Sequence, residues 1–221
     1  MSRLLLKVGG AVAGGVAAQV LELAEEHEVV VVHGAGPQIS ARLARLGLPV
    51  EFVAGRRVTS AEAIAVVREA LGDVNAELCA ALGDDAVGLI GDEIGLQATR
   101  VPDLGLVGDA VPSCPEAIED ALAASFIPVV APLAEGPLNV NADEMAAALA
   151  VGLDVDRICF LTDVPGLLLD GAVVGQIEAD YAEELLDNGL LEGGILPKLR
   201  AAVTAARFGV RAEIGETEVV A

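Results

Sequence analysis

The sequence contains very little lysine and very few aromatic residues. Of its 221 residues only two are lysine, against eleven arginines, and there is no tryptophan. With one tyrosine and four phenylalanines, a core has to be built from valine, alanine and leucine. Since 54% of the residues are hydrophobic, the chain is long enough to bury a large core as one domain.

Long apolar runs and paired cysteines are also missing. No apolar stretch approaches the roughly 20 residues that a membrane-spanning helix needs, and residues 4–6 are too short for a signal-peptide core. We therefore expect a cytoplasmic protein with no membrane partner. The cysteines Cys79, Cys114 and Cys159 are odd in number and widely spaced, which argues against a disulfide framework or a zinc site.

Positive charge is scarce as well, because the net charge is −21. This disfavours nucleic acid as a partner, since a phosphate backbone needs a basic patch. The Walker pattern G-x-x-x-x-G-K-[ST] and a G-x-G-x-x-G after the first predicted strand are absent, which disfavours a P-loop or a dinucleotide-binding enzyme. An anionic ligand would need a local site of glycine amides, helix N-termini and a few cations.

The chain alternates short β-rich runs with alanine-rich helical stretches. Strands are predicted at residues 4–8, 28–32, 86–90, 127–131 and 157–161, and hairpins at 50–59 and 99–112. Helices are predicted at residues 14–26, 34–46, 60–71, 74–82, 114–124, 142–152 and 180–188, with a last one ending at 208. This strand–glycine–helix order predicts an α/β fold with a parallel sheet covered on both faces. Gly136 and Pro137 are the best candidate for a boundary between two lobes.

Four glycine-rich turns follow predicted strands or open predicted helices. They lie at Gly9-Gly10, Gly34-Ala35-Gly36, residues 162–166 and Gly193-Gly194. In parallel α/β sheets such turns gather at the carboxyl edge, where glycine lets the backbone approach a phosphate. Any one of them alone is equally compatible with a plain turn.

The two lysines, Lys7 and Lys198, both lie beside these turns. Because the chain avoids lysine elsewhere, we predict that the two ammonium groups converge on phosphate oxygens. They would repel each other, so an acid between them is expected, and Asp143 at a predicted helix start is the candidate. Chance placement of the lysines and a simple helix-start role for Asp143 are the alternatives.

Other polar residues give weaker signals. Arg56 and Arg57 lie in the first predicted hairpin, where one could bind a substrate carboxylate in bidentate fashion and the other could be a solvated cation. His33 precedes a glycine turn and is expected mainly to shape it. No Ser/His/Asp set supports nucleophilic catalysis.

Several motifs in a fixed order carry a family resemblance. They include KVGG (7–10), VHGAGPQI (32–39), GRRVT (55–59), NVNAD (139–143), LTDVPG (161–166) and GGILPK (193–198). Together they resemble the amino-acid kinase family, and most closely its N-acetylglutamate kinase branch. The resemblance implies a three-layer αβα sandwich with a mainly parallel central sheet, as in carbamate kinase. It also implies that residues 1–135 form a lobe for the acyl amino acid and for dimerisation, and residues 136–221 a lobe for ATP.

The implied reaction is ATP-dependent phosphorylation of the γ-carboxylate of N-acetyl-L-glutamate in arginine biosynthesis, with Mg²⁺ held mainly by the ATP phosphates and no metal ligand from the protein. The resemblance assigns catalysis to Lys7, Lys198 and Asp143, substrate contacts to Gly34, Ala35, Arg57 and Asn139, and nucleotide contacts to Gly9, Gly10, Thr162, Asp163, Gly166 and Gly194.

The chain departs from the family pattern in places. Ala35 replaces the middle glycine of a triplet, and its methyl group could crowd the substrate. Residues 210–221 are shorter than the usual closing segment. The first predicted strand starts close to Met1, without the helix that links dimers into hexamers in arginine-inhibited members, so we expect a homodimer that arginine does not inhibit.

Two other functions are compatible with the same fold. One is a sister kinase of lysine biosynthesis that acts on an aminoadipate or a carrier-protein-linked substrate, although this acidic chain offers no obvious basic rim for an acidic carrier. The other is a non-catalytic sensor of an amino acid or nucleotide. Retention of Lys7, Lys198 and Asp143 argues against the sensor.

Overall fold

The computed structural model describes residues 1–10, 13–162 and 164–221, except for the side chains of residues 13 and 14. Within these residues the central sheet has eight strands, and all neighbouring pairs but one are parallel. In spatial order they are β14 (Gln176–Glu178), β16 (Thr217–Val220), β15 (Arg211–Ile214), β11 (Arg157–Phe160), β1 (Ser2–Val8), β2 (His27–His33), β8 (Ile127–Ala131) and β5 (Ala86–Ile90).

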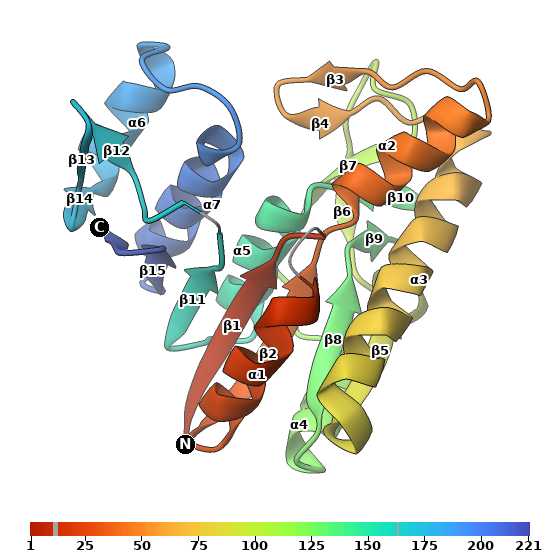
Figure 1. The fold of residues 1–221 in the computed structure, drawn as a ribbon, viewed down its shortest axis with the longest axis horizontal. Helices are drawn as coiled ribbons and strands as arrows, with labels where there is room; N and C mark the ends of the chain where they lie inside the picture. The colour runs from red at the N-terminus through yellow and green to blue at the C-terminus, as the bar shows by residue number, and fades with distance from the viewer. Residues whose placement is uncertain (11–12, 163) are drawn as a thin grey trace.

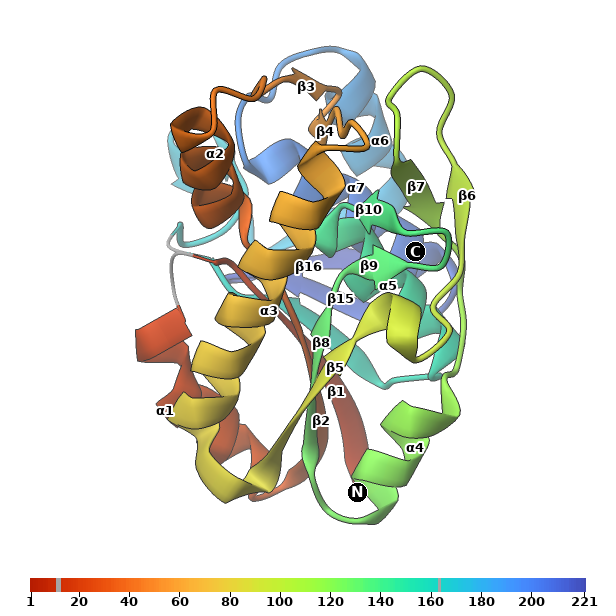
Figure 2. The ribbon, with the colours of Figure 1, turned by 90° about the vertical axis from the view of Figure 1, so that its right-hand side faces the viewer.

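Helices cover both faces of this sheet (Figures 1 and 2). One face carries α1 (Ala13–Ala24) and α3 (Ala63–Leu82), and the other carries α4 (Glu116–Ala123), α5 (Ala142–Gly152), α6 (Ala179–Asp187) and α7 (Ile195–Arg207). In the described part of the chain no helix is long and apolar enough to cross a membrane. The predicted α/β fold with three layers and a mainly parallel sheet is therefore confirmed.

Side chains on the central strands alternate between two buried clusters. Leu5 and Val30 pack with Phe160 against α5 and α7, while Leu4 and Val31 pack against α1 and α3. Successive side chains of a strand point to opposite faces, so a strand buried on both faces is apolar throughout. This explains the continuous aliphatic runs of β1 and β2.

Smaller β-structures lie beyond the carboxyl ends of the central strands. A four-stranded sheet has the order β6 (Ala98–Arg100), β7 (Val107–Ala110), β10 (Leu138–Val140) and β9 (Leu133–Ala134). Two hairpins are also present. One pairs β3 (Phe52–Val53) with β4 (Arg56–Arg57), and the other pairs β12 (Leu168–Leu169) with β13 (Ala172–Val173). The hairpins predicted at 50–59 and 99–112 are confirmed. Gly136 and Pro137 lie in the turn between the antiparallel strands β9 and β10. The division into lobes near this turn stays a prediction.

The structure differs from the sequence-based prediction in α3 and in several strands that were not predicted, among them β9, β10 and β14. Residues 60–71 and 74–82 do not form separate helices, because α3 runs unbroken from Ala63 to Leu82 through Gly72. Its buried residues keep the helical spacing across that glycine, and packing outweighs the roughly 1 kcal/mol cost of one interior glycine. Residues 210–221, for which no strand was predicted, contain the whole of β15 and β16 and extend the sheet beyond β11. Helix α2 (Gly36–Arg45) and two short 3₁₀ turns, Gly83–Asp85 and Gly91–Glu93, complete the elements.

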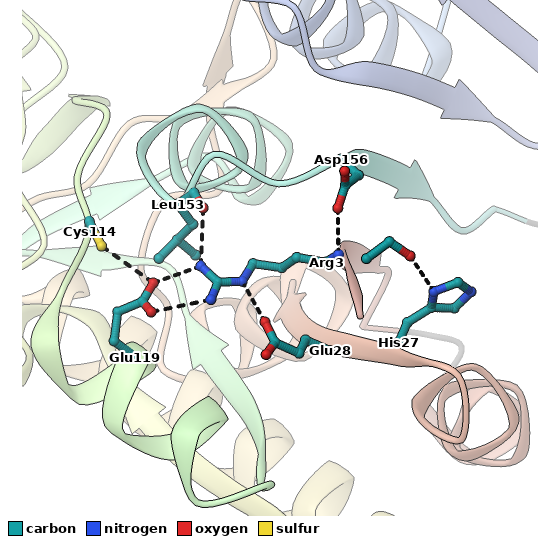
Figure 3. Close-up of polar contacts among 8 residues, drawn as sticks. Arg3, His27, Glu28, Cys114, Glu119, Leu153 and Asp156 are labelled. Carbon is teal, nitrogen blue, oxygen red and sulfur yellow. Dashed lines mark hydrogen bonds and ion pairs between the residues drawn. The ribbon is translucent and has the colours of Figure 1, made fainter.

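An arginine at the start of β1 holds the amino edge of the sheet together (Figure 3). The Arg3 guanidinium contacts Glu28 of β2 at 3.0 Å and Glu119 of α4 at 2.7 Å, and it also donates to the Leu153 carbonyl at 3.1 Å. Its backbone N–H donates to Asp156 at 2.7 Å. One side chain therefore connects β2 with α4 and the end of α5 at the end of the sheet opposite the carboxyl edge.

His33 is a neutral residue at the end of β2. It is completely buried, and Asn75 of α3 donates to its Nε2 at 3.1 Å and to the Val129 carbonyl at 2.8 Å. Because an amide nitrogen can only donate, His33 carries its proton on Nδ1, which faces the Gly34 carbonyl. Burial lowers the pKa of His33 to about 4, with only partial opposition from that carbonyl.

This lowered pKa predicts an acid-sensitive stability. The unfolded chain binds a proton at His33 below pH 6.5, whereas the folded chain binds it only near pH 4. The stability that is present above pH 6.5 is therefore lost as the pH falls from 6.5 to 4. We expect the free energy of unfolding to fall by roughly 2–3 kcal/mol from this group between pH 7.5 and 4.5. Urea unfolding of the parent and of His33→Asn, which cannot titrate, measures it. Equal losses in the two proteins would exclude His33 as the source.

Candidate active site

A cleft of about 600 Å³ opens at the carboxyl edge of the sheet. The ends of β1 and β11, the turn after β2, the β3–β4 hairpin and the first turns of α5 and α7 line it. Chain segments that are far apart in sequence therefore meet here, as expected for ligand sites in parallel α/β sheets. Of the thirteen residues assigned to the site from the sequence, eleven line this cleft.

The centre of the cleft is a carboxylate between two ammonium groups. Lys7 Nζ lies 2.8 Å from Asp143 Oδ1, and Lys198 Nζ lies 3.5 Å from the same oxygen. The exposed side-chain fractions are 7% for Lys7, 7% for Asp143 and 16% for Lys198. The predicted convergence of the two lysines on Asp143 is thus confirmed as geometry.

Local structure explains why these three side chains meet. Lys7 shares the face of β1 with Leu5, which packs toward α5 and α7. Asp143 lies in the first turn of α5, where the helix dipole favours an acid. Asn141 caps this helix by accepting from the N–H groups of Asp143 at 2.8 Å and Glu144 at 3.4 Å.

Burial and charge act in opposite directions on Lys7. Burial lowers its pKa from the usual 10.5, the Asp143 carboxylate raises it, and the neighbouring Lys198 ammonium lowers it again. The carboxylate therefore keeps a proton on a buried amine that burial alone would discourage. Because both lysines contact the same oxygen of Asp143, their ammonium groups lie close together in the cleft.

The glycine turns after β1 and β2 lie against each other. A Cβ on Gly10 would come within 2.7 Å of the Gly34 carbonyl, so only glycine fits there. Gln38 of α2 donates to the Gly10 carbonyl at 2.8 Å, and the Gly34 N–H donates to the Val8 carbonyl at 2.9 Å. These contacts place Gly9, Gly10 and Gly34 at the cleft beside Lys7.

Ala35 needs no glycine conformation. Its φ of −140° lies in the ordinary range, and its methyl group is 2% exposed among Ile39, Leu43 and their neighbours. The methyl group therefore packs largely into the core between α2 and α3, although the residue also lines the cleft.

The structure distinguishes the two hairpin arginines. Arg56 pairs with Glu144 at 3.0 Å and also with Asp109, so its charge is neutralised. Arg57 is buried under the Phe52 ring and donates only to neutral oxygens, the Gly36 carbonyl at 3.0 Å and Ser40 Oγ at 2.8 Å.

The Arg57 Nη1 atom is buried without a hydrogen-bond partner in the described part of the chain. Burial lowers the pKa of Arg57, because no carboxylate compensates for the lost water. Arg57 is thus the hairpin arginine whose charge no described carboxylate neutralises.

Asn139 of β10 lies on the same side of the cleft as Arg57. Its Nδ2 donates to the Thr59 hydroxyl at 3.0 Å, and that hydroxyl donates to the Arg57 carbonyl at 2.9 Å. Thr59, which was not assigned to the site from the sequence, therefore connects two residues that were.

The C-terminal half contributes fewer of the predicted residues. Thr162 and Gly194 line the cleft, and Thr162 Oγ1 accepts from the Val164 N–H at 3.4 Å. Gly166, with φ of +155°, lies away from the cleft lining, and a Cβ there would meet Thr217 Oγ1 at 2.5 Å. Gly166 therefore shapes the backbone next to β16. The predicted nucleotide residue Asp163 lies outside the described residues.

Residues 2–215 match the sequence model of the amino acid kinase family. The chain belongs to the amino acid kinase family. Acetylglutamate kinase from Rubrobacter xylanophilus is 42% identical over 97% of this chain and 88% of its own length. Acetylglutamate kinase from Koribacter versatilis is 40% identical over 94% of this chain and 87% of its own.

Solved structures agree with this family assignment. The structure of smu.665 from Streptococcus mutans UA159 has a TM-score of 0.90 at 29% identity and covers 98% of both chains. Carbamate kinase from Giardia has a TM-score of 0.74 at 14% identity, covering 99% of this chain and 98% of its own. The second likeness concerns the fold alone.

Two polar residues that line the cleft, Asn141 and Glu192, were not assigned to the site from the sequence, and neither was the buried Thr59. Asn141 could have been found, because an asparagine two residues before an acid at a helix start is an N-cap signal. Glu192 also lines the cleft, and no spacing rule distinguishes it from a surface acid. In the described part of the chain, no three His, Cys, Asp or Glu side chains gather in a group that could hold a metal.

The scarcity of lysine makes the central charge cluster directly measurable. NMR of protein labelled at lysine Cε gives one signal for each of the two lysines. We expect the signal of Lys7 to titrate below its usual 10.5, and Asp143→Asn to lower that pKa further because the opposing carboxylate is gone while Lys198 remains. Glu144→Gln is the neighbouring control and should leave the Lys7 titration unchanged. An Asp143→Asn protein with the parent titration would contradict the electrostatic coupling.

Proposed function

We propose that this chain is an acetylglutamate kinase, which transfers the γ-phosphoryl group of ATP to the γ-carboxylate of N-acetyl-L-glutamate in arginine biosynthesis. The observation that carries the proposal is the convergence of Lys7 and Lys198 on Asp143 beside two glycine turns. Relatives about 40% identical over most of the chain bear that name. A cytoplasmic location remains a prediction.

The proposed mechanism relies on alignment and charge rather than on a base. A γ-carboxylate with a pKa near 4.3 is already ionised at pH 7, so no residue has to remove a proton. Both reactants are anions, and phosphoryl transfer is accelerated mainly by positioning and charge stabilisation. Lys7 and Lys198 would contact the transferring group, and Asp143 would hold them in place.

The remaining cleft residues would each bind one of the two substrates. Arg57, with its unpartnered Nη1, and Asn139 would hold the acyl amino acid, with Gly34 and Ala35 beside it. Gly9, Gly10, Thr162 and Gly194 would approach the nucleotide, because glycine turns and a helix start offer amides to phosphate oxygens. Mg²⁺ would reduce the charge of the ATP phosphates and be held mainly by them and by water.

A substrate comparison tests the function. The purified chain is given ATP and, separately, N-acetyl-L-glutamate, N-acetyl-L-2-aminoadipate and L-glutamate, and the acyl phosphate is trapped with hydroxylamine. We expect the highest kcat/KM for N-acetyl-L-glutamate. A clear preference for the aminoadipate would favour the sister kinase, and no turnover of any acid would favour a sensor.

Single lysine variants test the residue roles. We expect Lys7→Ala and Lys198→Ala to lower kcat by about 100-fold or more, because each removes a charge that stabilises the transition state. Arg207→Ala is the matched control, since it removes a cation from the last turn of the same helix as Lys198. Near-normal kcat in both lysine variants would rule out the lysine assignment.

We also propose that the enzyme is a homodimer. Strand β5 is the edge of the central sheet next to β8, its sequence AVGLI is apolar, and its outer side pairs with no described strand. Exposed apolar edges of this kind pair readily with another chain. We expect light scattering to give twice the chain mass, and Val87→Lys on this edge to give a monomer. A parent protein that is monomeric or hexameric would contradict the proposal.

A further inference from the structure

Thr59 is a buried residue with a fully used hydroxyl group. It has 0% exposure, and its backbone is fixed by hydrogen bonds to the Leu104 carbonyl at 3.0 Å and from the Leu106 N–H at 2.7 Å. Its Oγ1 lies 2.9 Å from the Arg57 carbonyl oxygen and 3.0 Å from Asn139 Nδ2. Thr59 thus connects the hairpin that carries Arg57 to the strand that carries Asn139.

A count of donors and acceptors fixes the direction of both hydrogen bonds. A carbonyl oxygen can only accept, so the single proton of the Thr59 hydroxyl goes to the Arg57 carbonyl. Toward Asn139 the hydroxyl oxygen is then only an acceptor, and the Asn139 carboxamide must present its NH₂ group. The reversed carboxamide would set two acceptors against each other.

One consequence concerns the other end of the Asn139 carboxamide. With Nδ2 held by Thr59, Oδ1 is the outward acceptor, and it has no hydrogen-bond partner among the described residues, although Asn139 lines the cleft. An outward acceptor matches a substrate that offers an N–H group. The amide N–H of an N-acyl amino acid is such a donor.

We propose that Thr59 is a positioning residue that locks the Asn139 carboxamide with its oxygen toward the substrate, and that this lock makes the site select an acceptor substrate with an N–H at its α-position. The inference rests on the proposed function and adds a determinant of its specificity. Thr59 itself does not touch the substrate. It acts through Asn139 and, through the Arg57 carbonyl, on the backbone of the arginine beside it.

The test compares two substrates that differ only at the atom in question. (S)-2-Acetoxyglutarate keeps both carboxylates and the acetyl group of N-acetyl-L-glutamate but replaces the N–H with an ester oxygen. Facing a locked Asn139 Oδ1, the ester loses a hydrogen bond and sets two lone-pair-bearing oxygens against each other. We expect the parent enzyme to prefer the amide by about 10- to 100-fold in kcat/KM.

Two substitutions at Thr59 then distinguish the effect of its hydroxyl group from the effect of its side-chain volume. Thr59→Val keeps the volume but removes the hydroxyl, which frees the carboxamide to turn, so the amide preference should fall to within about threefold. Thr59→Ser keeps the hydroxyl and should retain the parent preference. Because both substrates meet the same enzyme preparation, the ratio is independent of how much of a variant is folded. Thr59→Ala serves in the same way if Thr59→Val does not fold.

Three results would overturn the inference: a parent enzyme that accepts amide and ester equally, a Thr59→Val enzyme with the parent preference, or a Thr59→Ser enzyme that has lost it. The KM for ATP should stay near the parent value in every variant, since none of the hydrogen bonds of Thr59 goes to a proposed nucleotide residue. Failure of the proposed function is a separate outcome, in which the parent enzyme phosphorylates neither substrate.

Discussion

The site depends on one carboxylate that holds two ammonium groups where little water reaches them. Without Asp143, Lys7 and Lys198 would repel each other, and the more buried Lys7 would tend to lose its proton. With it, the three groups together carry one positive charge, and Arg57 nearby adds a second cation that no described carboxylate neutralises. A protein with a net charge of −21 thus keeps a small positive volume for two anionic reactants. Removing one of the three side chains would leave a buried charge uncompensated. The free-energy cost of that buried charge exceeds the net stabilisation that the intact ion pair provides.

The fold serves this arrangement through its central strand. Strand β1 lies between β2 and β11. It carries Lys7 near its carboxyl end and Arg3 near its start. Arg3 connects the start of β1 to β2, to α4 and to the end of α5 (Figure 3), so the strand that bears Lys7 is anchored at its other end. Lys198 and Asp143 come from two helices packed side by side on the same face. The lysine geometry is therefore set by the main core and not by a surface loop.

The sequence predicted what local chemistry could signal. Lysine rarity and adjacent glycine turns were enough to identify Lys7 and Lys198, and a helix-start acid was enough for Asp143. The local pattern could not decide between Arg56 and Arg57, because the carboxylates that neutralise Arg56 come from distant positions in β7 and α5, and only the family resemblance pointed to Arg57. Thr59 escaped notice because its importance depends on which atoms its single proton and its lone pairs meet. The continuous α3 and the C-terminal strands were missed because tertiary packing overrides a glycine and short polar strands carry weak periodicity.

The wide separation of Lys7 and Lys198 along the chain has a consequence for how the protein is made. Synthesis produces Lys7 long before Lys198, and the three charges cannot meet until α7 has been made and lies beside α5. Contacts between such distant residues form late in folding, because closing long loops costs entropy before the contact repays it. A nascent chain on the ribosome can assemble β1, β2 and the helices beside them, but it lacks the second lysine. A chain that has been synthesised only as far as α6 therefore lacks the full set of groups proposed to act on ATP.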